Sequence, residues 1–78
     1  MPIQIPVKDI KSGDLIVFMY CDLHYMNISS IKENKDNAFY YYIFGSCWNA
    51  SRGKREFYNP DPGFQISGSQ EVLVLNRN

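Results

Sequence analysis

The sequence predicts an all-β protein, a small barrel or β-roll of five to six short strands, in a single domain that spans residues 1–78. Runs rich in β-branched and aromatic residues recur along the chain, and turn residues separate them about every 8–12 residues. No segment keeps a helical period over ten or more residues. A chain this short buries only about 60–65% of its unfolded surface, so its core is small and oligomerisation would help to stabilise it.

The first third of the chain predicts an extended entry segment and two strands. Pro2 and Pro6 have no backbone N–H to donate, so we expect the segment between them at a sheet edge or under a loop. Leu15–Tyr20 follows a glycine turn and is too short for a helix, which predicts a strand. Residues 24–32 alternate in part between apolar and polar side chains, which predicts a second one.

The strongest strand signal is the run Phe-Tyr-Tyr-Tyr-Ile-Phe within residues 38–46. A polar turn at 33–37 joins it to the preceding strand, so the two are expected to form a hairpin. Residues 49–55 are polar and basic without any period and predict a loop, and the proline-rich stretch 59–63 predicts another. Further short strands are expected at 56–58, 64–66 and 71–75.

Residues 7–17 (Val-Lys-Asp-Ile-Lys-Ser-Gly-Asp-Leu-Ile-Val) resemble the entry of small SH3-like barrels. In that family a hydrophobic-x-x-Gly-Asp-hydrophobic turn leads into the first long strand, and the match covers about a sixth of this chain. Such barrels, many of them encoded by phages and mobile elements, mostly serve as binding modules. The resemblance therefore implies a phage-type, non-enzymatic binding protein, and it carries over no catalytic residue.

Three of the predicted strands are apolar on both faces, whereas a strand with one solvated face alternates apolar and polar residues. They are Leu15–Tyr20, 39–44 and 71–75. One small core covers only one face of each strand. Three explanations stay open: a tightly wound barrel that buries both faces, a homo-oligomer that hides the outer face, and an exposed face for another partner.

The candidate binding surface combines aromatic and basic residues. Tyr40 and Tyr42 fall on the more polar side of their strand, so Phe39 and Ile43 are expected to face inward. Trp48 follows that strand beside a basic loop, and Trp, Tyr and Arg dominate binding hot spots. The alternative is a tryptophan that caps the barrel beside a solvated loop. The candidate partner-binding residues are Tyr40, Tyr42, Trp48, Arg52, Arg55 and Tyr58.

Metal and enzymatic chemistry have little support in the sequence. Cys21 and His24 form a Cys-x-x-His pair and Cys47 offers a third ligand, but structural zinc needs four ligands and a second pair is missing. A Cys–His nucleophile lacks an identifiable orienting residue, and no phosphate-binding loop or nucleophile elbow occurs. We expect no catalytic residue, no metal and no cofactor, and we expect both cysteines to be buried free thiols.

The sequence thus favours a protein-binding module, an inhibitor or adaptor of the phage type that binds another protein, itself as a homodimer, or both. Nucleic-acid or nucleotide binding by aromatic stacking and the basic loop is an alternative, which the zero net charge disfavours. A structural subunit of an oligomeric assembly is another. The sequence shows neither a signal peptide nor an apolar run long enough for a membrane span, so we expect a cytoplasmic protein without membrane contact.

Overall fold

The computed structural model describes residues 2–58 and 63–77, except for the side chain of Tyr58. Within these ranges it contains seven strands, one short 3-10 helix and no α-helix, which confirms the all-β class. The additional strand is the entry segment. The elements are β1 (Ile3–Pro6), the 3-10 helix (Val7–Asp9), β2 (Leu15–Tyr20), β3 (Asp22–Glu33), β4 (Tyr40–Asn49), β5 (Lys54–Tyr58), β6 (Phe64–Ser67) and β7 (Glu71–Asn76).

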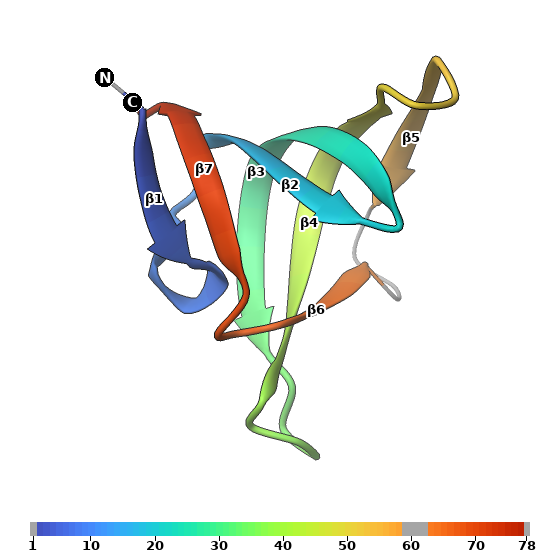
Figure 1. Cartoon of the computed structure of the whole chain (residues 1–78). Coiled ribbons are helices and arrows are strands. Elements are labelled where there is room, and N and C mark those ends of the chain that lie inside the picture. The colour runs from blue at the N-terminus through green and yellow to red at the C-terminus, as the bar shows by residue number, and fades with distance from the viewer. Residues whose placement is uncertain (1, 59–62, 78) are drawn as a thin grey trace.

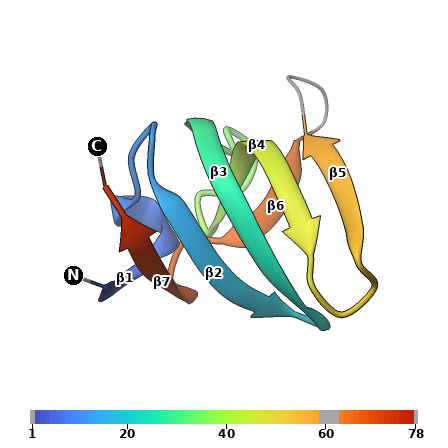
Figure 2. The same ribbon diagram turned by 90° about the horizontal axis from the view of Figure 1, so that it is seen from above.

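All strands join one antiparallel sheet in the order β1-β7-β2-β3-β4-β5, with β6 paired to β4 (Figures 1 and 2). The long strand β4 is shared, because its first half pairs with β6 and its second half with β5. The sheet curls around the core but is not closed into a barrel. In the described part of the chain β1 pairs only with β7 and β5 only with β4, so the predicted barrel closure is not present.

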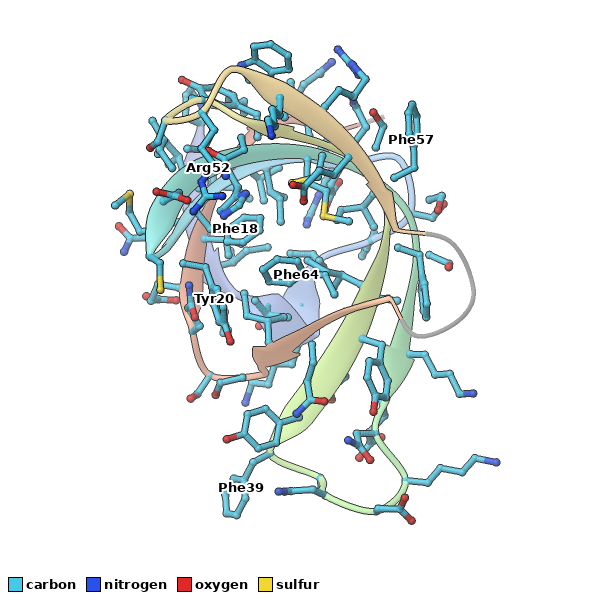
Figure 3. All side chains as sticks on the ribbon, turned by 90° about the vertical axis from the view of Figure 1, so that its right-hand side faces the viewer. Phe18, Tyr20, Phe39, Arg52, Phe57 and Phe64 are labelled. Carbon is cyan, nitrogen blue, oxygen red and sulfur yellow. The ribbon has the colours of Figure 1, made fainter. Side chains whose placement is uncertain are left out.

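The core lies on the concave side of the curled sheet and follows the alternation of each strand. Phe18 and Phe64 point into this interior from β2 and β6 (Figure 3), with their rings edge to face at a centroid distance of 5.4 Å. The 3-10 helix contributes Val7 and closes the core near β1. The other core side chains are Ile10, Ile16, Met26, Ile28, Ile43, Cys47, Ile66, Val72 and Val74.

A bulge bends the β3–β4 hairpin. The register of the two strands shifts between Ile28 and Ser30, opposite Gly45. The backbone of Gly45 has φ of +149°, and a Cβ at this position would overlap the carbonyl oxygen of Asn27. Beyond the bulge the hairpin protrudes from the body of the protein (Figure 1).

The expectation that Phe39 faces inward is wrong. Its side chain is 79% exposed near the tip of the protruding hairpin (Figure 3). Residues 38 and 39 belong to the turn, and β4 begins one residue later, at Tyr40. The backbone N–H of Phe39 donates to the Asn37 side chain, so the turn geometry and not the strand alternation sets the direction of this phenylalanine. Ile43 is fully buried, as expected.

Candidate binding face

One continuous row of side chains crosses the convex side of the sheet from edge to edge. Cross-strand partners follow one another through β1, β7, β2, β3, β4 and β5, and their side chains alternate with the buried residues of each strand. We call this set the outer row. It consists of Gln4, Leu73, Val17, Tyr25, Trp48 and Arg55, in spatial order.

In the described part of the chain, the apolar side chains of this row stay partly exposed. Leu73, Tyr25 and Trp48 are 38%, 37% and 39% exposed. On the same side of the sheet, Met19 and Phe57 are 61% and 67% exposed, and Phe57 points away from the body in Figure 3. A tightly wound barrel that buries both faces therefore does not explain the two-sided apolar strands. The outer face remains available to another surface.

A depression of about 470 Å³ lies at the β3–β4–β5 end of the outer row. Tyr25 of β3 and Trp48 of β4 line it, together with Leu15 of β2 and Ser46 of β4. Arg55 also lines it. Its Nη1 donates to Ser46 Oγ over 2.8 Å, and its guanidinium lies 5.9 Å from the centroid of the Trp48 ring.

A second depression, of about 340 Å³, lies at the opposite end of the outer row. Val17, Met19 and Leu73 line it from β2 and β7, with Leu23 of β3 and Gln4 of β1 beside them. This end is more apolar than the depression beside Trp48. The face is thus apolar along much of its length, with Arg55 at one end and Glu71 in the lining of the depression at the other.

The structure brings together two of the predicted binding residues, Trp48 and Arg55, which are direct partners across β4 and β5. Tyr40 and Tyr42 lie on the same side of β4 but on the far side of the bulge, outside the depression. The hydroxyl of Tyr42 accepts a hydrogen bond from Asn34 Nδ2 over 3.3 Å, which ties it to the hairpin turn.

Arg52 is also separate from the depression. Arg52 lies in the β4–β5 turn, where its Nε is 3.4 Å from Asp22 Oδ2, so this cation has a carboxylate partner. Tyr58 is the last residue of β5 and its backbone lies opposite Gly45, while its side chain falls outside the described part of the structure. Of the predicted residues whose side chains the structure describes, Trp48 and Arg55 line this depression.

Sequence reasoning missed five residues that line the depression, although one signal was present for two of them, Tyr25 and Asn27. The five are Leu15, Tyr25, Asn27, Ser46 and Ala50. The alternation of residues 24–32 places His24, Met26 and Ile28 on one face, and Tyr25, Asn27 and Ser29 on the other. The residues that lie beside Tyr25 depend on the register of β3 against its neighbouring strands. The local sequence pattern does not specify that register.

His24 contacts Cys47, but the geometry and the protonation state of the thiol do not favour nucleophilic attack. His24 Nε2 donates to the carbonyl oxygen of Tyr20 over 3.3 Å, so Nδ1 is left to accept from the Cys47 thiol at 3.5 Å. Burial, with a smaller contribution from the charge of Glu56, raises the pKa of Cys47 to about 11. At neutral pH the thiol is protonated, and the thiolate that a nucleophile needs is absent.

The expectation of two buried thiols is wrong for Cys21, which is exposed. This residue forms the tight turn between β2 and β3 with a φ of +61°, so its side chain points away from the core. Cys47 is buried, as expected. In the ranges that the structure describes, no group of three or more His, Cys, Asp or Glu side chains is placed to hold a metal ion.

The fold and the face define a small all-β protein whose single curled sheet presents an uncovered aromatic row with one cation. Comparison of the chain with protein-family models, with curated proteins and with solved structures finds no match. Among residues 2–58 and 63–77 there is no helix with the length and hydropathy of a membrane span.

Proposed function

We propose that the protein is a non-enzymatic protein-binding module and that the outer row is its contact surface. The observation that carries this proposal is the uninterrupted, half-exposed apolar row from Leu73 through Tyr25 to Trp48, which ends at Arg55. Aromatic residues and arginine in an exposed apolar patch are the composition of binding hot spots. The proposal includes action as an inhibitor or adaptor, which the resemblance of residues 7–17 to SH3-like binding modules supports.

The position of the row on the sheet also supports this function. Tyr25 and Trp48 lie on adjacent strands of the sheet and are held by the hydrogen bonds of β3 and β4 on both sides. Binding to such a surface loses little conformational entropy, because the backbone that carries the aromatic side chains is already ordered.

Binding of nucleic acid has less support. Single-stranded nucleic acids bind to a track of several cations beside stacked aromatic residues. Of the described residues that line the depression, only Arg55 is charged, and Arg52 is engaged with Asp22. A zero net charge adds no general attraction for phosphates.

Photo-crosslinking tests the proposal. Benzoylphenylalanine in place of Tyr25 should form a covalent adduct with a protein partner in an extract of the source cells. The same group in place of Phe39, which is exposed at the hairpin tip, is the control and should not. Light scattering during size-exclusion chromatography then shows whether the adduct contains a second copy of the chain or a different protein.

Affinity for the crosslinked partner gives the quantitative test. Trp48→Ala should weaken binding by about 30-fold, equivalent to about 2 kcal/mol, with an unchanged circular dichroism spectrum. Phe39→Ala, which also removes an exposed aromatic ring, should leave the affinity unchanged. Equal effects of the two substitutions would show that the outer row is not the contact surface.

A further inference from the structure

Among the described residues, Arg55 is the cation that lines the depression, and it has N–H donors that are not engaged. The contacts of Arg55 with Ser46 and with the Trp48 ring hold its guanidinium at the edge of the depression and engage only Nη1 in a hydrogen bond. Within residues 2–58 and 63–77, no carboxylate forms an ion pair with it. Its neighbour Glu56 is paired with the buried Cys47 and so lies on the opposite face of β5. The remaining N–H groups can accept a carboxylate in the two-pronged geometry that arginine favours.

The rest of the depression is suited to an apolar group beside that carboxylate. Leu15, Tyr25, Trp48 and Ala50 provide apolar surface, and the volume of about 470 Å³ lies within the range of sites that hold small ligands or a few side chains. The amide of Asn27 provides polar groups that can pair with a peptide backbone.

We propose that this depression recognises a carboxylate next to a large apolar side chain, so that the partner presents an acidic–apolar peptide segment to Trp48 and Arg55. This inference rests on the proposed function and adds the chemistry of the partner. A carboxylate matches Arg55, the one cation among the described lining residues, whereas a polynucleotide would leave most of its phosphates without a partner there. The aromatic and aliphatic walls bind the neighbouring Leu or Phe side chain of the segment.

Trp48 is the only tryptophan of the chain, so its fluorescence reports directly on the depression. The probes are two blocked peptides, acetyl-Gly-Leu-Asp-Phe-Gly-amide and the same peptide with Asn in place of Asp. The Asp peptide should change the fluorescence saturably and bind at least about fivefold more tightly than the Asn peptide, because its carboxylate forms charge-assisted hydrogen bonds.

Arg55→Gln should abolish the preference for the Asp peptide, and Arg55→Lys should retain only part of it, because lysine keeps the charge but not the two-pronged geometry. Arg52→Gln is the matched control, since it removes a nearby arginine that does not line the depression, and it should keep the full preference. Circular dichroism spectra that match the wild type show that each variant is folded.

Several results would overturn the inference: no saturable change with the Asp peptide at millimolar concentration, equal binding of the two peptides, or a preference that survives in Arg55→Gln. Tighter binding of adenosine monophosphate than of the Asp peptide would overturn it in favour of a nucleotide site. The proposed function fails separately, if Trp48→Ala leaves binding of the crosslinked partner unchanged. If Trp48→Ala weakens binding of the crosslinked partner and Arg55→Gln does not, the proposed protein-binding function stands and the carboxylate site is refuted.

Discussion

Asp14 and Arg77 join the end of the chain to its first turn, and substitution of Arg77 tests how much this contact stabilises the fold. Asp14 has a fully buried side chain in the turn before β2, and Arg77 directly follows β7. The guanidinium donates from Nε to Oδ1 over 3.0 Å and from Nη2 to Oδ2 over 2.9 Å. The backbone N–H of Lys11 donates to Oδ2 over 2.8 Å.

Arg77→Gln removes both guanidinium hydrogen bonds to Asp14, together with a weaker one from Nη2 to the Asp9 carbonyl oxygen over 3.4 Å, and leaves the buried carboxylate with the Lys11 N–H. Loss of one partner of a buried ion pair costs about 3–5 kcal/mol. The Arg77 side chain is 35% exposed, so water partly screens the pair and can replace some of its contacts with the carboxylate. We therefore expect the free energy of unfolding at pH 7 to fall by about 2–3 kcal/mol. For a chain of 78 residues this is a large part of the total stability.

The loss of unfolding free energy in Arg77→Gln should become smaller as the pH falls. Burial raises the pKa of Asp14, but the hydrogen bonds from Arg77 and Lys11 and their charges outweigh it, so the pKa lies below its ordinary value of 3.8. A carboxyl group with a lowered pKa in the folded state stabilises the protein above its unfolded pKa, and this contribution disappears as the pH falls through the folded pKa. The difference between the wild type and Arg77→Gln should therefore shrink from pH 7 to pH 3.

Urea unfolding, followed by circular dichroism at both pH values, measures this difference. Arg52→Gln is the control, because its ion pair with Asp22 is exposed and should contribute less than about 0.5 kcal/mol. A loss for Arg77→Gln below about 1 kcal/mol at pH 7, or an equal loss at pH 7 and pH 3, would refute the reasoning.

Two further predictions concern the bulge and the thiols. Gly45→Ala should destabilise the protein by more than about 3 kcal/mol, because the new Cβ would overlap the Asn27 carbonyl. Gly53→Ala should destabilise it by only about 1 kcal/mol, because Gly53 has a φ of +65° but open space around it. Thermal melts compare the two, and equal losses would contradict the role of the bulge. At pH 8 Cys21 should react rapidly with dithiobis(nitrobenzoate) and Cys47, whose pKa is about 11, only after denaturation. Rapid reaction of two thiols per folded chain would contradict this prediction, because it would show that Cys47 is accessible to the reagent.

Local patterns predicted most of the strands, because strand formation depends on the density of β-branched and aromatic residues between turn signals. The strand Leu15–Tyr20 agrees with β2 residue for residue. The predicted and observed boundaries of the other strands differ by a few residues. At Phe39 such a difference changed the direction of the side chain, because this residue lies in the turn before β4. Near a turn, hydrogen bonds such as that from the Phe39 N–H to Asn37 replace strand alternation, so a shift of one residue changes which side chains face the core.

The sequence by itself determined which side chains of a strand lie on opposite faces, and therefore that this small domain has more apolar surface than one core can cover. It did not determine which outward residues become neighbours. Tyr25, Trp48 and Arg55 meet because the turns and the bulge at Gly45 set the register of three strands. Strands that are apolar on both faces specify that register weakly, since a slip of one residue still places apolar side chains inward. The tertiary structure alone therefore decided which residues form the candidate binding face.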